Sequence, residues 1–461
     1  MTGHFYFASF RDKMLLTNDS GRYAFLSQNE FTQLINEDDN LDAELREMLE
    51  DDGFCYSDSV EGYIRRNKEI VRDANSYLLS ATSLFILAVT NACNYRCVYC
   101  QANGMNKANH MSREVAEQAL QRIKDSPSND VTIEFQGGEP LLNYDVIQYT
   151  VKRGQELLQN KKVQYTVVSN LSLLKEEMAT FFKENNVSIS TSIDGPAILH
   201  DYNRPEANGQ GSYRDTIRGI ELLRSKGMSP GAIQTTTSSS LNYAKEIIDE
   251  YVRLGFRQIF LRPLTRLGAA ARCWDQIGYD ADRFLKFYRA ALNRIIEYNL
   301  NGTPVKEYHA SLFLSKILYG QSVNYMELRS PCGAGIGQVA ITANGNVYTC
   351  DEGRMMAEMG DEAFCLGNVF HNTYNDWIQS SNCQAICSAS LLDTLPGCCD
   401  CVYKPYCGVC PVINYAIYGN ITHVSTERCK IYKGILDILF EYIMKRDNKI
   451  QMLFEEWGKQ A

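Results

Sequence analysis

Strand-like and helix-like segments alternate between residue 84 and about residue 264, and this alternation limits the possible folds strongly. Each run rich in β-branched and aromatic residues precedes an amphipathic stretch, which is typical of β/α units with right-handed crossovers around a parallel sheet. Six strands are too few for a standard closed barrel of eight, so we predict an α/β fold with a partial (β/α)6 barrel over 84–304. Functional loops then belong at the C-terminal ends of the strands. The six runs are SLFILAV, VTIEFQG, VQYTVVS, VSISTSI, AIQTTTS and QIFLRPL.

The sixteen cysteines of this 461-residue chain are unevenly placed. We find no signal-peptide pattern and no run of about 18 apolar residues, so we expect a cytoplasmic protein without a membrane partner. Disulfides are rare in that compartment, and so many cysteines indicate metal or cluster ligands. Three cysteines lie within 93–100 and eleven within 332–429, whereas Cys55 and Cys273 stand apart and are expected to be small buried apolar residues.

Residues 1–60 are expected to form a separate unit of three short strands followed by two helices, the first with capping-box spacing from Ser27 to Glu30. This order resembles the winged-helix leader-peptide recognition element of peptide-modifying enzymes. The unit holds four basic and thirteen acidic residues, a balance of −9 that equals the formal charge of the whole chain. Phosphates would be repelled, so we expect no nucleic acid partner and favour a peptide added at an exposed strand edge. A solvated acidic face without a partner is the alternative. A linker helix is expected over 61–83.

The first cysteine group has the spacing CxxxCxxC and directly follows the first barrel strand; its members are Cys93, Cys97 and Cys100. Three thiolates on one loop suit three irons of a four-iron cluster whose fourth iron stays open. Zinc sites usually have four protein ligands, so this loop leaves zinc short of one.

At the end of a first β/α strand, this motif resembles the signature of the radical S-adenosylmethionine (SAM) enzymes. The resemblance implies that the open iron binds the methionine part of SAM, and that reductive cleavage gives a 5′-deoxyadenosyl radical that removes hydrogen. Tyr99 stands where the family places an aromatic residue near the adenine. Gly137, Gly138 and Glu139 match the family's GGEP motif; the glycines would let the backbone approach the ligand, and Glu139 would accept from the ammonium group.

Later strand ends complete the SAM site that the resemblance implies. The third strand ends in Ser-Asn-Leu where the family often has a Thr-Asn-Gly-like turn near the ribose. After the fourth strand, an Arg suits a paired contact with the methionine carboxylate, although an Asp–Arg salt bridge of purely structural role is the alternative. His200 has no metal-ligand spacing and is expected to be structural. The candidate residues are Ser169, Asn170, Ser192, Asp194 and Arg204.

The late cysteines, within a bridging segment and cysteine-rich region over 305–461, resemble the SPASM domain, which carries two auxiliary four-iron clusters. The resemblance assigns Cys398, Cys401, Cys407 and Cys429 to a distal cluster. It assigns Cys332, Cys350 and Cys410 to a proximal one, whose fourth ligand is Cys387 or Cys383 unless that iron stays open. Zinc staples are the alternative. Cys365 and Cys399 are not expected to be ligands, and a final helix is expected over about 433–457.

Asp351 follows Cys350 at the position where related sulfatase-maturating enzymes have a base. A carboxylate there could accept the proton released when a substrate radical is oxidised. The alternative is a carboxylate that only bonds a loop amide.

Together these features predict a radical SAM/SPASM oxidoreductase with SAM and three [4Fe-4S] clusters that matures a ribosomally made peptide. The N-terminal part is similar to maturases of His-Xaa-Ser-type systems, and more distantly the chain is similar to sactisynthases. We expect oxidative cross-linking (C–C, C–S or C–O), a leader bound at 1–60, and a reductant such as flavodoxin or ferredoxin. The alternatives are a protein-modifying maturase of the anaerobic sulfatase-activating type, a peptide hydroxylase or epimerase, and a zinc-stapled binding module without catalysis.

Overall fold

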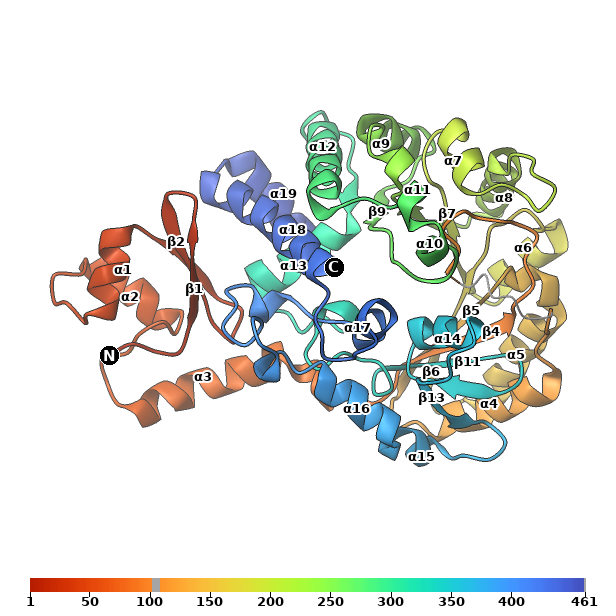
Figure 1. Cartoon of the computed structure of the whole chain (residues 1–461), viewed down its shortest axis with the longest axis horizontal. Helices are drawn as coiled ribbons and strands as arrows, with labels where there is room; N and C mark the ends of the chain where they lie inside the picture. The colour runs from red at the N-terminus through yellow and green to blue at the C-terminus, as the bar shows by residue number, and fades with distance from the viewer. Residues whose placement is uncertain (102–107, 460–461) are drawn as a thin grey trace.

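The computed structural model describes residues 1–101 and 108–459. It contains a three-stranded sheet near the N-terminus and a ten-stranded sheet that forms most of the molecule. Figure 1 shows the small sheet at the left, the large sheet at the right, and helices α18 and α19 between them. In the described part of the chain, no helix is both long and apolar enough to span a bilayer.

The large sheet has the strand order β10-β9-β8-β7-β6-β5-β4-β11-β12-β13. Strands β4 to β9 are parallel and coincide with the six predicted runs, so the predicted α/β fold with a mostly parallel sheet is confirmed. The six are β4 (Leu84–Thr90), β5 (Asp130–Gly137), β6 (Lys162–Val168), β7 (Ser188–Ser192), β8 (Gly231–Thr235) and β9 (Gln258–Arg262).

Four further strands extend both edges, which the sequence did not predict. The C-terminal region adds β11 parallel to β4 and then two antiparallel strands, and β10 pairs with β9. The cysteine-rich region therefore continues the barrel sheet directly. The added strands are β10 (Lys306–Glu307), β11 (Gln338–Ile341), β12 (Asn346–Tyr348) and β13 (Cys365–Asn368).

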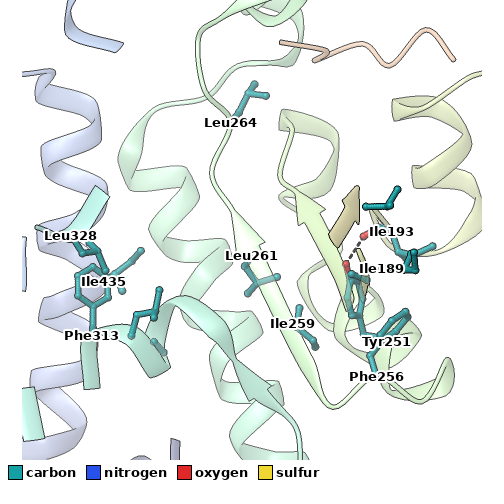
Figure 2. Packing of buried hydrophobic residues seen from close by; sticks show 14 of the residues in the cluster. Ile189, Ile193, Tyr251, Phe256, Ile259, Leu261, Leu264, Phe313, Leu328 and Ile435 are labelled. Atoms are coloured by element: carbon teal, nitrogen blue, oxygen red, sulfur yellow. Dashed lines mark hydrogen bonds between the residues drawn. The ribbon is translucent and has the colours of Figure 1, made fainter. Parts of the chain in front are cut away.

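Helices connect the parallel strands, and apolar side chains from both kinds of element form the main core. In Figure 2 the Tyr251 hydroxyl on α9 donates to the Ile193 carbonyl at 2.7 Å, beside Ile259 and Leu261 of β9. This bond satisfies the one polar atom of a fully buried tyrosine. The barrel helices are α4 (Arg113–Asp125), α5 (Tyr144–Leu157), α6 (Glu176–Glu184), α7 (Ala197–Asn203), α8 (Tyr213–Ser225), α9 (Ala244–Arg253), α10 (Gly268–Arg272), α11 (Trp274–Ile277) and α12 (Ala281–Leu300).

The C-terminal region is held together by short helices between the cysteine loops. The expected final helix is two helices, because Arg446 takes a left-handed conformation (φ +52°) that breaks the run between α18 and α19. The helices are α13 (Tyr308–Tyr319), α14 (Asp351–Glu358), α15 (Tyr374–Gln379), α16 (Ser381–Ala389), α17 (Pro411–Tyr418), α18 (Thr426–Lys445) and α19 (Asn448–Lys459).

The N-terminal sheet is antiparallel, in the order β1 (Tyr6–Phe10), β2 (Lys13–Thr17), β3 (Tyr23–Leu26), and carries its own apolar core. The predicted capping box is present: the Ser27 hydroxyl accepts from Glu30 N at 3.2 Å, and the Glu30 carboxylate accepts from Ser27 N at 2.6 Å. The helices are α1 (Gln28–Ile35), α2 (Ala43–Asp51) and α3 (Val60–Ala74). Helix α3 therefore covers only the first part of the expected linker helix.

Candidate active site

The three cysteines of the first group lie in the loop after β4, at the C-terminal edge of the parallel sheet. All three are partly buried, and Cys93 and Cys97 each interact electrostatically with Cys100. Burial raises the pKa of Cys93 to about 11 and that of Cys97 to about 12, since a thiolate loses its hydration there. Thiols in this state ionise readily only beside a cation, so the loop fits ligands of a metal cluster.

The glycine pair after β5 packs directly against this cysteine loop. The Gly138 amide donates to the Thr90 carbonyl and the Glu139 amide to the Ala92 carbonyl, both at 2.8 Å. A Cβ on Gly137 would lie 2.0 Å from the Thr90 oxygen, and one on Gly138 would lie 2.1 Å from the Ala92 oxygen. Glycine is therefore required for the contact between the two loops. A close approach of these glycines to SAM stays a prediction.

Glu139 is buried (1% exposed), and its carboxylate joins the ends of β5 and β6. Its carboxylate accepts from Ser169 Oγ at 2.7 Å, Asn170 N at 2.8 Å and Leu141 N at 3.0 Å. Burial raises its pKa, and these hydrogen bonds oppose the rise. A carboxylate has about four acceptor positions, so one remains for the predicted ammonium contact.

The turn after β6 has a left-handed residue at the position where the resemblance implies glycine. Leu171 has φ +64°, in the left-handed region that favours glycine, and is fully buried. The preceding Asn170 donates from Nδ2 to Asn94 Oδ1 at 2.9 Å, which links this turn to the cysteine loop. Leucine therefore takes a left-handed conformation in a turn where the resemblance implies glycine.

Tyr99 connects the two charged residues predicted after β7. Its hydroxyl donates to Asp194 Oδ2 at 2.8 Å and accepts from Arg204 Nη1 at 2.7 Å, so the hydroxyl bridges the carboxylate and the guanidinium. Burial raises the pKa of Asp194, and the Arg204 charge opposes this. Arg204 Nε and His200 Nε2 are buried without a hydrogen-bond partner. An unpartnered guanidinium N–H in this position fits an anionic ligand group such as the predicted methionine carboxylate. Ser192, the last residue of β7, lies two positions before Asp194.

The late cysteines form two neighbouring sets, and Cys410 of the first set also lines the cavity of the second. Cys332, Cys350 and Cys410 share one buried cluster, and the thiols of this trio interact electrostatically with one another. The second set surrounds a cavity of about 30 Å³, and burial raises the pKa of Cys407 in this set to about 12. The residues of the second set are Cys398, Cys401, Cys407 and Cys429.

All sixteen cysteines lie within the described residues, and all are free thiols there. Within the same residues, no three Cys, His, Asp or Glu side chains are arranged to hold a single metal ion. A four-iron cluster keeps its cysteine sulfurs apart by its own width, so a wider arrangement is compatible with clusters.

Cys383 and Cys387 lie one turn apart on α16 and hydrogen-bond to each other. The bond from Cys383 lowers the pKa of Cys387, and the Arg329 guanidinium lowers it further. Arg329 acts electrostatically on both Cys332 and Cys387, and the Cys332 amide donates to Ser390 Oγ at 3.0 Å, so the end of α16 lies beside the proximal trio.

Asp351 begins α14 directly after its N-cap, Cys350. Its Oδ1 accepts from Arg354 Nη2 at 2.6 Å and Nε at 2.9 Å, and Arg354 also interacts with Cys100. The candidate base therefore lies between the first cysteine loop and the proximal trio. Its catalytic role stays a prediction.

Four charged residues beside the trio were missed by the sequence reasoning. Glu352 lies with Oε1 3.8 Å from Arg262 Nη2, and Glu327 accepts from Arg428 Nη2 at 2.9 Å. Burial raises the pKa of Glu352, and the Glu327 carboxylate raises it further. Arg262 could have been found from the sequence, because it ends a predicted strand and the C-terminal ends of barrel strands line active sites.

An apolar groove of about 420 Å³ lies between the loop after β9 and helices α17 and α18. Arg428 lines this groove and also the distal cysteine cavity. The groove therefore reaches the neighbourhood of both late cysteine sets. Its apolar lining includes Leu264, Trp274, Tyr279, Ile417, Ile431 and Tyr432.

Residues 87–243 match the family model described as the radical SAM superfamily. This part of the chain is a radical SAM domain, and the resemblance stated from the motifs is confirmed. Curated relatives of the chain include a cyclopropyl synthase and anaerobic sulfatase-maturating enzymes.

The chain is 23% identical over 455 residues to the radical SAM cyclopropyl synthase TigE of Paramaledivibacter caminithermalis. The aligned region covers 93% of this chain and 86% of TigE. The structure of anSMEcpe with bound AdoMet and the Cp18Cys peptide superposes with a TM-score of 0.68 at 20% identity, covering 79% of this chain and 98% of that one. The structure of Streptococcus suis SuiB bound to precursor peptide SuiA superposes with a TM-score of 0.57 at 15% identity, covering 93% of this chain and 99% of that one. These two likenesses show the fold. The chain also spans 60% of an uncharacterised Methanocaldococcus jannaschii protein, at 34% identity over 174 residues.

Proposed function

We propose that this chain is a SAM-dependent radical enzyme that modifies a ribosomally made peptide, with oxidative cross-linking as the reaction. The observation that carries the proposal is the convergence of three loops at one edge of the sheet: the cysteine loop, the Gly137–Glu139 loop and the turn after β6. A reduced four-iron cluster with an open iron supplies the electron that cleaves SAM to the hydrogen-abstracting radical.

The chain's own residues supply the binding and orientation. Arg204 has an unpartnered Nε for the SAM carboxylate, and Asp194 and Tyr99 fix the guanidinium from its other side. Ser169 and Asn170 stand at the end of β6 for the ribose, although Ser169 already donates to Glu139. Ser192 ends the neighbouring strand β7, and we expect its hydroxyl to contribute to carboxylate binding.

The two late cysteine sets suit two auxiliary four-iron clusters, with Asp351 placed to accept a substrate proton between them and the SAM site. Two additional redox centres favour a net two-electron oxidation over hydroxylation or epimerisation. A flavodoxin or ferredoxin would supply reducing equivalents. The 420 Å³ groove beside Arg428 suits the core segment of the peptide.

The N-terminal sheet suits the leader segment of the peptide. Its edge strands are β1 and β3. Phe7 on β1 is half exposed, and its ring centroid lies 4.9 Å from that of Phe31. Main-chain bonds to a strand edge with side chains in such apolar positions are a recurring mode of peptide binding. SuiB bound to the precursor peptide SuiA and anSMEcpe bound to the Cp18Cys peptide share the fold.

Anaerobic reconstitution tests the proposal. We expect about twelve irons per chain and absorption near ~400 nm if three four-iron clusters form. Cys97→Ala should abolish 5′-deoxyadenosine formation while the late cysteines keep their iron, and Cys399→Ala, at an exposed position, is the matched control. A colourless chain that binds zinc, or SAM cleavage that persists in Cys97→Ala, would contradict the proposal.

The sulfatase-type alternative differs in how it finds its substrate. Reversal of the charges along one edge of the N-terminal unit should weaken binding of a precursor that carries its leader. Binding of a short core peptide should stay unchanged. If both substrates respond equally, the leader role of residues 1–60 is wrong and a protein-modifying maturase is favoured.

A further inference from the structure

The distal set of cysteines borders a cavity of about 30 Å³ that three cations of the described chain also line. So small a cavity brings each lining side chain close to the thiols. Lys433 follows Cys429 by four positions on α18, so both side chains extend from the same face of that helix. Lys433 also hydrogen-bonds to Cys401. The distal set is Cys398, Cys401, Cys407 and Cys429, and the three cations are Lys404, Arg428 and Lys433.

Two of these cations already have carboxylate partners. Lys404 pairs with Asp19 at 3.3 Å and also with Asp393. Arg428 Nη2 lies 2.9 Å from Glu327 Oε2. Since no carboxylate lines the cavity within the described residues, these two positive charges are neutralised from outside it.

Lys433 differs from both, because it forms no ion pair with a carboxylate among residues 1–101 and 108–459. Asp437, one turn further along α18, accepts from the Tyr403 hydroxyl instead. Burial lowers the pKa of Lys433, but the thiols of Cys401 and Cys429 raise it above its usual value. A partly buried ammonium group is costly without an anionic partner, and the distal thiolates are the partners within reach.

We propose that the Lys433 ammonium group donates to the thiolates of the distal set and raises the reduction potential of the cluster that they hold. The inference rests on the proposed function only in requiring that cluster. A four-iron cluster with four thiolates is anionic and gains a further negative charge on reduction, so a nearby cation stabilises the reduced form more than the oxidised form. A hydrogen bond to a ligand sulfur acts in the same direction.

The test uses the full chain with Cys93, Cys97 and Cys100 changed to Ala, so that all iron signals come from the late cysteines. This parent is reconstituted anaerobically with iron and sulfide. Its iron content is measured, and its EPR spectrum is followed through a redox titration. The signal that changes in Cys398→Ala identifies the distal cluster and gives its midpoint potential.

Three variants of the parent separate charge from packing. Lys433→Met removes the positive charge, and Lys433→Arg keeps it. Lys430→Met is the matched control, because Lys430 lies on the same helix with a side chain that is 64% exposed.

In Lys433→Met the equilibrium constant for reduction of the distal cluster should fall about tenfold, which corresponds to about 59 mV for a one-electron couple. Lys433→Arg and Lys430→Met should keep the midpoint potential of the parent. An iron content equal to that of the parent, together with an unchanged proximal signal, shows that a variant has folded.

Four results would overturn the inference. The distal potential of Lys433→Met could equal that of Lys430→Met, which would mean that the ammonium group does not act on the cluster. Lys433→Arg could shift the potential as far as Lys433→Met, which would trace the shift to packing. Loss of the distal iron in Lys433→Met alone would make the charge a requirement for assembly of the cluster and not a determinant of its potential. A parent that takes up no iron at all would instead refute the late clusters of the proposed function, and this inference with them.

Discussion

Removal of the Tyr99 hydroxyl should weaken SAM binding and leave the clusters intact. In Tyr99→Phe the ring that is expected to pack near the adenine remains, and only the bridge between Asp194 and Arg204 is lost. In the variant, Arg204 is free to turn towards Asp194 and pair with it directly. SAM would then have to break that pair before its carboxylate could bind.

The size of the effect follows from the two lost hydrogen bonds. A hydrogen bond to a charged group contributes about 1.5–3 kcal/mol, so the two set an upper limit of about 3–6 kcal/mol. Direct pairing of the two charges recovers roughly half of this, which leaves about 1.5–3 kcal/mol. At about 1.4 kcal/mol per tenfold change, the SAM dissociation constant should rise roughly 10- to 140-fold.

Anaerobic equilibrium dialysis with labelled SAM measures this change on chains of matched iron content. Tyr202→Phe is the control, because Tyr202 lies on the neighbouring helix α7 and is 59% exposed. If Tyr99→Phe binds SAM within twofold of the unchanged chain, the hydroxyl bridge does not position Arg204 and the reasoning fails.

Further changes probe other parts of the molecule. Gly138→Ala places a Cβ 2.1 Å from a backbone oxygen, so we expect iron loss from the first cysteine loop by iron analysis; full retention would contradict this. Leu171→Gly removes about 1–2 kcal/mol of left-handed strain but leaves a cavity that costs about 2–5 kcal/mol, so unfolding should show net destabilisation, and a more stable variant would refute this. Asp351→Asn should lower peptide product formation roughly 10²–10⁴-fold while 5′-deoxyadenosine still forms; equal loss of both would count against a base. Lys404 donates to the Tyr6 hydroxyl of the N-terminal sheet at 2.6 Å and pairs with Asp19 at 3.3 Å, so Lys404→Met should make residues 1–83 more sensitive to limited proteolysis; unchanged digestion would show that these contacts do not hold the sheet in place.

The parallel strands and their functional ends could be predicted because the signals are local. Each strand is a run of five to eight residues that contains β-branched or aromatic residues, and each is followed by a helix with its own apolar face. The cysteine loop and the Gly-Gly-Glu loop directly follow two of these strands, so a parallel sheet brings both loops to the same edge. The capping box at Ser27 was likewise visible as two residues three apart.

Partner choice across the sheet could not be predicted, because it depends on contacts between distant segments. Strand β11 has four residues and pairs with a strand more than 200 positions earlier, Leu84–Thr90. Glu139 looked like a ligand to SAM, yet its carboxylate mostly bonds Ser169 and Asn170 from the next strand end. Asp351 and Arg354 have a spacing that could have been recognised, since residues three apart on a helix face each other.

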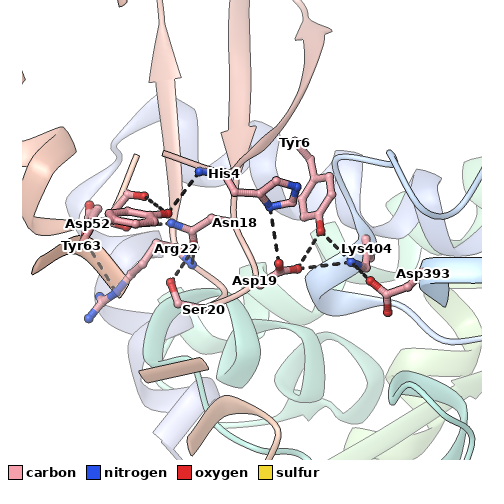
Figure 3. Close-up of polar contacts among 11 residues, drawn as sticks. His4, Tyr6, Asn18, Asp19, Ser20, Arg22, Asp52, Tyr63, Asp393 and Lys404 are labelled. Atoms are coloured by element: carbon pink, nitrogen blue, oxygen red, sulfur yellow. Dashed lines mark hydrogen bonds and ion pairs between the residues drawn. The ribbon is translucent and has the colours of Figure 1, made fainter. Parts of the chain in front are cut away.

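The placement of the N-terminal sheet connects the proposed leader site with the distal cysteine set. In Figure 3, Lys404, which lies between Cys401 and Cys407, donates to the Tyr6 hydroxyl at 2.6 Å and to Asp19 at 3.3 Å, and it also pairs with Asp393. The Thr17 hydroxyl donates to the Val402 carbonyl at 2.6 Å in the same loop. A peptide strand added to this sheet would therefore lie next to contacts with the loop that contains Val402 and Lys404, between the distal cysteines Cys401 and Cys407. The acidic unit that seemed separable in the sequence is joined in the structure to the cysteine loops that it would serve.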